Sequence, residues 1–205
     1  SFASVKTLED LKTTLKNRPS KILIIGGGSN ILLTEDFEGL VLHIDLKGIE
    51  VCKKQNETTI VKVSAGENWH DFVLWSLKQN LGGIENLSLI PGNVGTAPIQ
   101  NIGAYGVEIK DVFDSLQAMH RETLEMQSFD AEACRFGYRE SVFKQTFKDQ
   151  FVITSVTFRL SKTPNFHLEY GAIREVLETN GIDQPSIRAI SDAVIQIRQS
   201  KLPDP

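Results

Sequence analysis

The chain has few cysteines and histidines. Only two of its 205 residues are cysteine, Cys52 and Cys134, which is too few for a disulfide scaffold or a four-thiolate metal site. A reducing compartment fits such cysteine usage best, so we expect a cytoplasmic protein. The four histidines are scattered without an i, i+4 pair, a pattern unfavourable for a histidine metal centre. We therefore expect no bound metal.

The sequence also lacks long apolar runs and an excess of basic residues. No apolar run approaches the ~20 residues that a membrane-spanning helix needs, and the N-terminus has no basic segment followed by an apolar one. The formal net charge of -4 gives no basic face for nucleic acid or for an anionic membrane surface. What remains is an ordinary composition, with 40% hydrophobic and 23% charged residues. It is typical of a soluble protein with a sizeable core, in one large or two small domains.

Apolar periodicity predicts a mixture of helices and strands. Thr7, Asn68 and Ser186 are suited to cap helices that start at the next residue, and Asp130 is suited to cap a short helical turn. Alternating or continuous apolar runs predict strands, some of them paired across polar turns. The predicted helices are 8–16, 69–80, 131–135, 172–178 and a last one that starts at 187 and has an apolar stripe to Ile197. The predicted strands are 21–25, 39–44, 49–53, 59–64, 111–119, 125–129 and 151–160.

The stretch from Ile84 to Gly106 mixes glycine and proline with apolar residues such as Leu87, Val94 and Ile102. Such a mixture is wrong for a solvated linker and predicts a buried loop. A long buried loop must satisfy its backbone N–H and C=O groups, and a bound ligand is a natural partner. Glycine allows backbone to approach a ligand closely, and rows of amides bind phosphate oxygens. An ordinary packed Ω-loop is the alternative.

A second glycine-rich loop, Gly26 to Asn30, follows the predicted strand 21–25 directly. It lacks the G-x-G-x-x-G spacing of a dinucleotide fold because the sixth position is Ile31, and the residues that follow look extended rather than helical. The loop can still present its amides and the Ser29 hydroxyl to a diphosphate. A simple connection between strands is the alternative.

Two arginines and a tyrosine lie within five residues, at Arg135, Tyr138 and Arg139. The planar guanidinium fork suits a carboxylate or a phosphate, and the tyrosine adds a hydrogen-bond donor that can stack on a ring. The group therefore suits an anionic substrate. The alternative is that both arginines are surface residues paired with Glu132 and Glu140.

Six stretches of the chain agree, in the right order, with one family. They are GGGSN (26–30), AGENWH (65–70), IPGNVGTAPIQNIGAYG (90–106), CRFGYR (134–139), Tyr170-Gly171 and SKLPDP (200–205). Together they resemble the family of UDP-N-acetylenolpyruvoylglucosamine reductases over nearly the whole chain. Any one of them is a weak signal, but the long loop with CRFGYR at this separation is specific.

The resemblance implies an α+β architecture, the FAD-binding fold of vanillyl-alcohol oxidase and p-cresol methylhydroxylase in two α/β subdomains. We expect residues 1–48 to form the first FAD-binding subdomain and residues 49–163 the second. Residues 164–205 would be a segment that closes over the substrate, together with the start of a substrate domain that is mostly missing. A cytoplasmic monomer is expected.

The resemblance also implies a tightly held FAD that is reduced by NADPH as the hydride donor. The cofactor is expected at the two glycine-rich loops. The residues expected to bind it are Gly26, Gly27, Gly28, Ser29, Asn30, Pro91, Gly92, Asn93, Val94, Gly95, Thr96, Gln100, Asn101, Gly103, Ala104, Tyr105 and Gly106.

The implied reaction is that of a UDP-N-acetylmuramate dehydrogenase. It reduces the enolpyruvyl ether of UDP-N-acetylglucosamine to the lactyl ether, giving UDP-N-acetylmuramate for peptidoglycan. By its place in the motif, Arg139 would pair with the substrate carboxylate and stabilise an enolate-like intermediate. Tyr138 would line the same site, Tyr170 would close over the substrate, and Lys201 would contact its diphosphate.

The sequence departs from the family at its C-terminus. The family's proton donor is a serine in a segment that directly follows the KLPDP match, assisted by a late glutamate, and this chain ends at Pro205 before both. We therefore expect an inactive fragment that holds FAD. Two other functions stay open: another FAD oxidoreductase of the same fold that acts on an alcohol or amine, and a non-catalytic nucleotide-binding module.

Overall fold

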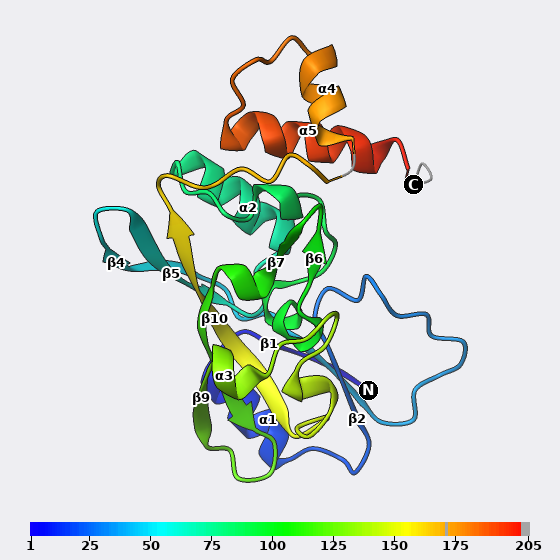
Figure 1. The fold of residues 1–205 in the computed structure, drawn as a ribbon. Coiled ribbons are helices and arrows are strands. Elements are labelled where there is room, and N and C mark those ends of the chain that lie inside the picture. The colour runs from blue at the N-terminus through cyan, green and yellow to red at the C-terminus, as the bar shows by residue number, and fades with distance from the viewer. Residues whose placement is uncertain (171, 202–205) are drawn as a thin grey trace.

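The computed structural model describes residues 1–170 and 172–201 and has an α+β fold (Figure 1). Its strands form a three-stranded sheet in the order β1-β3-β2, a five-stranded sheet in the order β4-β5-β10-β8-β9, and the small hairpin β6-β7. The expected α+β class is confirmed. No helix in the described ranges is long and apolar enough to cross a membrane.

The N-terminal unit consists of β1 (Phe2–Val5), α1 (Leu8–Lys16), β2 (Ile22–Ile25) and β3 (Leu40–Ile44), and its three strands are parallel. Helix α1 begins where predicted, because the Thr7 hydroxyl accepts the Asp10 N–H at 3.0 Å and the Asp10 carboxylate accepts the Thr7 N–H at 3.1 Å. Strand β1 was not predicted. Four residues carry too little pattern to reveal a strand, and β1 exists because it pairs along β3.

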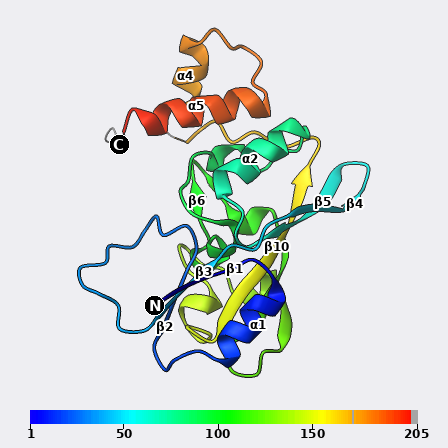
Figure 2. The ribbon, with the colours of Figure 1, turned by 180° about the vertical axis from the view of Figure 1, so that it is seen from behind.

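The five-stranded sheet is antiparallel and contains β4 (Ile49–Lys54), β5 (Thr58–Ser64), β8 (Phe113–His120), β9 (Met126–Asp130) and β10 (Phe151–Ser161). The long strand β10 lies in the middle, between β5 and β8. Figure 2 shows α2 (Trp69–Lys78) lying beside the end of this sheet. The helix buries Trp69 and Phe72 against Phe158 of β10, with ring centroids 5.9 and 4.9 Å apart.

The predicted buried loop is confirmed. Most of its residues are buried, and it contains 3₁₀ turns at Glu85–Leu87, Val94–Thr96 and Pro98–Gln100. The hairpin of β6 (Gly103–Ala104) and β7 (Val107–Glu108) follows. A further 3₁₀ turn, Ile109–Asp111, takes the residues predicted to begin the next strand, so β8 starts at Phe113.

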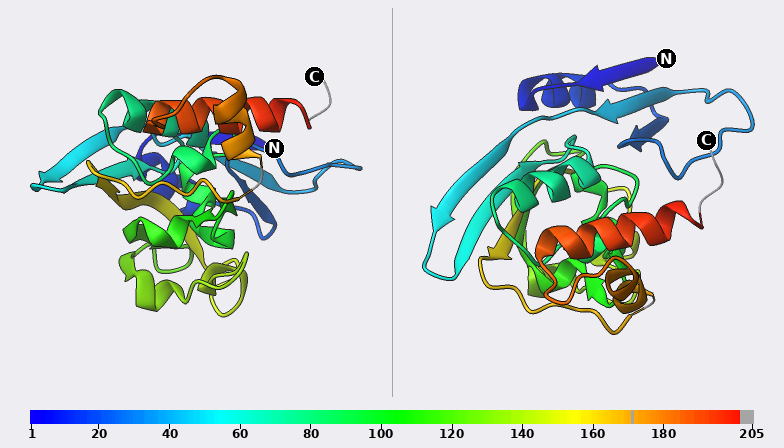
Figure 3. Two further views of the ribbon diagram at one scale, coloured as in Figure 1. Left: turned by 45° about the horizontal axis from the view of Figure 1, so that its top comes forward. Right: turned by 90° about the horizontal axis from the view of Figure 1, so that it is seen from above.

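The C-terminal part is helical. Beyond the short α3 (Ala131–Cys134), which Asp130 caps as predicted, α4 (Ile173–Thr179) and α5 (Ile187–Gln199) pack on each other (Figure 3). Their apolar faces form a separate cluster that includes Ile173, Leu177, Ile190 and Val194. Of the motif residues, Gly171 and 202–205 lie outside the described residues.

Candidate functional site

The two glycine-rich loops contact each other. A Cβ added to Gly26 would lie 2.7 Å from Cγ2 of Thr96, and one added to Gly27 would lie 2.8 Å from Oδ1 of Asn93. A Cβ on Gly92 would lie 3.5 Å from Oγ of Ser29. Side chains at Gly26 and Gly27 would therefore fill the space between the loops, so glycine there is what keeps a cradle open.

The cradle offers unused backbone donors. Within the described residues, the N–H groups of Gly26 to Asn30 and of Gly92 and Asn93 have no protein acceptor. The next two amides of the second loop are used by the protein, because Val94 N–H donates to Glu67 O at 2.8 Å and Gly95 N–H donates to Ala65 O at 2.9 Å. The protein's own hydrogen bonds therefore occupy part of the expected FAD loop, whereas the N–H groups of Gly92 and Asn93 stay available beside the first loop, and Pro91 has no N–H.

The other residues predicted to bind FAD lie partly in the core and partly in the β6-β7 hairpin. Gln100 is exposed and Asn101 is fully buried, while Gly103 and Ala104 belong to the β6-β7 hairpin. The turn of that hairpin carries Tyr105 and Gly106, both with positive φ (50° and 80°). A positive φ at a tyrosine is sparsely populated, and such residues cluster at functional sites.

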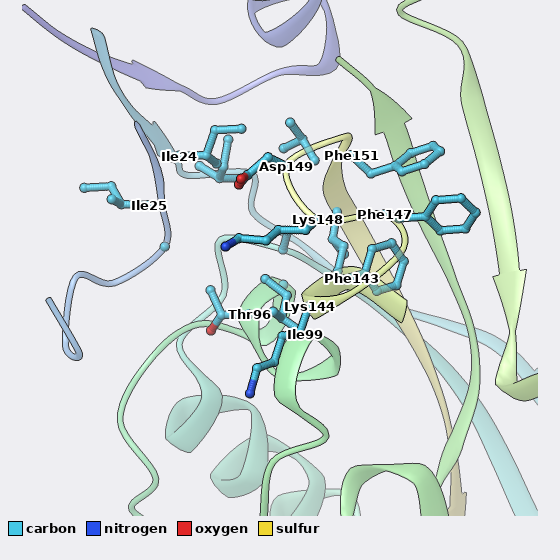
Figure 4. Close-up of a pocket in the computed structure, with 16 residues that line it drawn as sticks. Ile24, Ile25, Thr96, Ile99, Phe143, Lys144, Phe147, Lys148, Asp149 and Phe151 are labelled. Carbon is cyan, nitrogen blue, oxygen red and sulfur yellow. The ribbon is translucent and has the colours of Figure 1, made fainter. Parts of the chain in front are cut away.

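A first cavity, of about 350 Å³, borders the cradle at Gly26, Gly95 and Thr96. Figure 4 shows Ile24 and Ile25 of β2 on one side and residues of the segment 143–151 on the other. Most of the wall is apolar, and two lysines lie at its edge. The residues of segment 143–151 that line it are Phe143, Lys144, Phe147, Lys148, Asp149 and Phe151.

Sequence reasoning missed this segment as part of a site. Its one signal is the four-residue repeat of Phe143, Phe147 and Phe151, which alone indicates only a packed face. Phe129 takes part in that packing, with ring centroids 5.1 to 5.8 Å from the three phenylalanines. The aromatic packing therefore supports the wall of the cavity.

A second cavity, of about 610 Å³, opens at the β6-β7 hairpin. It brings together three predicted residues from distant parts of the sequence, Tyr138, Arg139 and Tyr170, with Tyr105. Its charged lining consists of three cations and two acids, which are Lys110, Arg139, Arg198, Glu108 and Asp111. The balance of charge favours an anionic ligand.

Arg139 adopts a left-handed conformation (φ 53°), and its guanidinium donates to the carbonyl of Gly103 on the hairpin. The Lys144 ammonium donates to the Arg139 carbonyl at 2.9 Å, which holds the backbone from the other side. Among the ion pairs of the described residues, none joins Arg135 or Arg139 to the neighbouring glutamates. Both arginines are exposed, as the alternative expected, but neither is paired with Glu132 or Glu140 in the described structure.

The acids of the second cavity are already partnered. A hydrogen bond from Lys110 holds the pKa of Glu108 below its usual value, and the same contact raises the pKa of Lys110. Arg139 also lies close enough to Glu108 to favour its charged form. The carboxylate of Glu108 thus stays ionised at neutral pH, and the Lys110 charge is compensated locally.

Tyr170 and Lys201 differ in their placement. Tyr170 is 62% exposed and lies beside Gly106, where an added Cβ would be 3.5 Å from the Tyr170 Cβ. Lys201 is exposed and is not part of the cavity lining, which α5 reaches through Arg198, one turn earlier. Arg198 was not predicted, although its spacing of three residues from Lys201 was a usable signal.

These features fit a ligand with a diphosphate and aromatic rings. The free amides suit anionic oxygens, and the apolar cavity beside them suits a ring. The loop that lines the first cavity at Gly95, Thr96 and Ile99 continues into the hairpin that lines the second at 103–108.

Residues 2–122 match the family model described as an FAD binding domain. The chain belongs to this FAD-binding domain family. Curated relatives add to this: the chain is 55% identical over 206 residues to UDP-N-acetylenolpyruvoylglucosamine reductase of Flavobacterium johnsoniae, a match that covers 100% of the chain and 61% of the relative. It is 50% identical over 190 residues to the reductase of that name from Pseudomonas aeruginosa, covering 93% of the chain and 56% of the relative.

Solved structures show the same FAD-binding fold. The UDP-N-acetylenolpyruvylglucosamine reductase of Thermus caldophilus superposes with a TM-score of 0.64 at 20% identity, covering 98% of this chain and 88% of that chain. Cholesterol oxidase from B. sterolicum gives a TM-score of 0.54 at 18% identity, covering 80% of this chain and 34% of that chain. At these identities the likeness concerns the fold, which confirms the expected fold class.

Proposed function

We propose that this chain is the FAD-binding part of a UDP-N-acetylenolpyruvoylglucosamine reductase, which reduces UDP-N-acetyl-3-O-(1-carboxyvinyl)-glucosamine to UDP-N-acetylmuramate with NADPH. The observation that carries the proposal is the convergence of Tyr138, Arg139 and Tyr170 on one cavity beside the glycine-rich loop. Identity of 47–55% to curated reductases supports it. The chain spans only 61% of the Flavobacterium relative's length, so the proposal concerns the whole enzyme of which this sequence matches part.

FAD would be held by the cradle and the first cavity. The amides of Gly26 to Asn30, with those of Gly92 and Asn93, would bind its diphosphate, and the cavity lined by Phe143 and Ile25 would take a ring. Lys144 and Lys148 would add positive charge near the phosphates. When bound, FAD would supply the redox chemistry, the transfer of a hydride from NADPH to the enolpyruvyl group.

The chain's own residues would act on the substrate. Reduction of an enolpyruvyl ether builds negative charge on its carboxylate, and Arg139 is fixed by Gly103 and Lys144 at the wall where that charge would develop. Such a preorganised cation needs little reorganisation during the reaction, so it lowers the barrier more than a mobile one. Tyr138 and Tyr170 would flank the sugar nucleotide, and Arg198, with Lys201 beyond it, would meet the diphosphate.

The proposal also includes the division of the chain and its setting in the cell. Apolar clusters support the boundary near residue 163, because one cluster centres on the five-stranded sheet and another on α4 and α5. The boundary near residue 48 follows the change from the three-stranded to the five-stranded sheet, although the cluster around α1 and β3 also includes Ala65, Met119 and Val152. We propose that the enzyme works as a cytoplasmic monomer on a small-molecule substrate, without nucleic-acid or membrane partners.

Replacing each of the two arginines of CRFGYR by lysine, one at a time, tests the function. In a protein with the full length of the relatives, Arg139→Lys removes the planar fork at the cavity and should lower kcat for the enolpyruvyl substrate by about 100-fold. Arg135→Lys is the matched control, since Arg135 lies outside the cavity lining, and should change kcat by less than about twofold. Substrate-dependent NADPH oxidation gives kcat, and the visible spectrum reports bound FAD.

Two results would refute the function. The first is a wild-type protein that is colourless and binds no added FAD. The second is a yellow wild-type protein that oxidises simple alcohols or amines but does not reduce the enolpyruvyl sugar nucleotide.

A further inference from the structure

Tyr170 is carried by a segment with few backbone contacts. This strap (residues 162–170) connects β10 to α4 without regular structure, and most of its side chains are exposed. Its start is fixed, because the Lys162 N–H donates to Glu57 O at 2.9 Å and the Thr163 hydroxyl donates to the Glu57 carboxylate at 2.8 Å. Figures 1 and 3 show the strap crossing from the end of β10 to the helical pair.

Beyond this start, a single buried side chain holds the backbone of the strap. Within the described residues, the one hydrogen bond to the backbone of 164–170 comes from Asn86 Nδ2, which donates to the His167 carbonyl at 2.8 Å. The same nitrogen donates to the Tyr105 carbonyl at 2.9 Å. Asn86 is 1% exposed and belongs to the turn Glu85–Leu87 of the buried loop.

The chemistry of this contact requires an amide. Both partners are carbonyl oxygens, so the group between them must donate twice, which the NH₂ of asparagine does and a carboxylate or hydroxyl does not. The Oδ1 atom of Asn86 is buried without a partner in the described part of the chain. An amide kept in place although half of its hydrogen-bonding capacity is unused indicates that the two donated bonds are its role.

The two acceptors belong to the hairpin and to the strap, and Tyr105 of the hairpin and Tyr170 of the strap both line the second cavity. Tyr105 is at the turn of the β6-β7 hairpin, and His167 precedes Tyr170 by three residues. Gly106 lies between them: an added Cβ there would be 4.0 Å from the His167 Cβ and 3.5 Å from the Tyr170 Cβ. The Asn86 amide therefore fixes the spacing between the hairpin and the strap.

We propose that Asn86 is a positioning residue that fastens the strap to the hairpin and so places Tyr170 over the cavity. The inference rests on the proposed function for what Tyr170 touches, but the fastening itself is independent of the reaction. Without the amide, the strap would keep its anchor at Lys162, the packing of Leu168 against the α4–α5 cluster and its continuation into α4, and the backbone around His167 would separate from the hairpin.

Limited proteolysis measures the fastening directly. Asn86→Asp keeps the size of the side chain, removes both donors and places negative charge against two carbonyls. Chymotryptic cleavage after Phe166, Leu168 or Tyr170, identified by mass spectrometry, should become at least about tenfold faster, because local opening is governed by the lost hydrogen bonds. Asn17→Asp is the control with the same chemical change, on an exposed residue after α1 and far from the strap, and its cleavage rate should equal that of wild type.

Steady-state kinetics, measured on a protein with the full length of the relatives, distinguish a positioning role of Asn86 from a general loss of folded structure. Asn86→Asp should raise KM for the enolpyruvyl substrate about tenfold and change kcat by less than about threefold, since contacts from Tyr170 to substrate would act on binding. FAD affinity should stay within twofold of wild type. If the wild type does not reduce the enolpyruvyl substrate, the proposed function fails while the proteolysis result still decides the fastening.

A second variant keeps the inference testable if Asn86→Asp does not fold. Asn86→Ser is neutral and shorter and cannot reach both carbonyls, so strap cleavage should again accelerate, by a smaller factor. Cleavage within twofold of wild type in the folded variant, or a fall in kcat with KM unchanged, would overturn the inference.

Discussion

The two glycine-rich loops contact each other but are built in opposite ways. The first, Gly26 to Asn30, lies mostly in solvent, and its amides have no protein acceptor in the described structure. The second, Ile84 to Gly106, is mostly buried, and only Gly92 and Asn93 leave their amides free where it meets the first. The first loop supplies most of the free N–H donors. The second loop is fixed in the core and sets the position at which those donors can face a ligand.

The apolar residues between the glycines explain the difference. Leu87, Val94 and Ile102 enter the main core and pull the second loop inward, whereas the residues after the first loop, such as Leu32 at 87% exposure, find no core to enter. Glycine content alone therefore does not determine whether a loop is buried. What the glycines decide is how closely the two backbones approach.

The largest expected effect is at Gly95, where the second loop touches the sheet. A Cβ there would lie 2.5 Å from the Ala65 Cβ and 3.1 Å from the Ala65 oxygen that accepts the Gly95 N–H. Gly95→Ala should therefore lower the free energy of unfolding by about 3 kcal/mol through overpacking. Urea denaturation measures the change.

Gly28→Ala in the exposed loop is the comparison for Gly95→Ala. Nothing lies within 4 Å of its added Cβ, and only its φ of 68° opposes the substitution. The expected loss is about 1 kcal/mol. Equal losses at the two positions would show that the loops do not differ in packing.

Gly27→Ala should affect ligand binding more than stability. Its Cβ would enter the cradle, 2.8 Å from Asn93 Oδ1, while its φ is not in the left-handed region. We expect FAD affinity to fall at least about tenfold, by flavin titration, with a stability change below about 1 kcal/mol. Gly181→Ala, at φ 68° between α4 and α5, should show the reverse: a small loss of stability and unchanged FAD affinity.

The smallest effect concerns the buried acid of the second loop. Burial raises the pKa of Glu85, although the Gly83 N–H donates to its carboxylate at 2.6 Å. A carboxyl whose folded-state pKa is raised stabilises the fold below its unfolded pKa, and this contribution is lost as pH rises through the folded pKa. Glu85→Gln should therefore raise Tm relative to wild type at pH 7 but not at pH 4.

Glu35→Gln gives the matched control for Glu85→Gln. It removes the same charge from the exposed loop 26–39, where the side chain is in solvent. A pH-dependent gain of the same size in both variants would assign the effect to net charge rather than to burial.

Local patterns predicted most of this fold. Caps at Thr7, Asn68 and Ser186 located the helices, and the mixture of glycine with apolar residues predicted the buried loop. The features that were missed depend on partners far away in the sequence. Strand β1 needs β3, and Arg198 reaches the cavity only because α5 packs beside the loop.

The same reason explains why the sequence does not show which amides of the second loop stay available. Which N–H groups of the second loop remain available depends on whether Ala65 and Glu67 come close enough to accept them. The sequence of the loop alone does not show whether these two acceptors come close. Composition predicted a ligand-binding backbone, and the tertiary contacts determined which part of it faces the ligand.

Within the described residues, β10 is the last strand along the chain and the central one in its sheet. While a ribosome is still synthesising Phe151–Ser161, β5 and β8 each have an unpaired edge and the sheet consists of two separate halves. The Thr154 carbonyl, which accepts the Ala65 N–H, is also still missing beneath the second loop. A cofactor site between the two loops therefore requires residues 151–161 to be in place, and a chain released before residue 161 would expose edges prone to association.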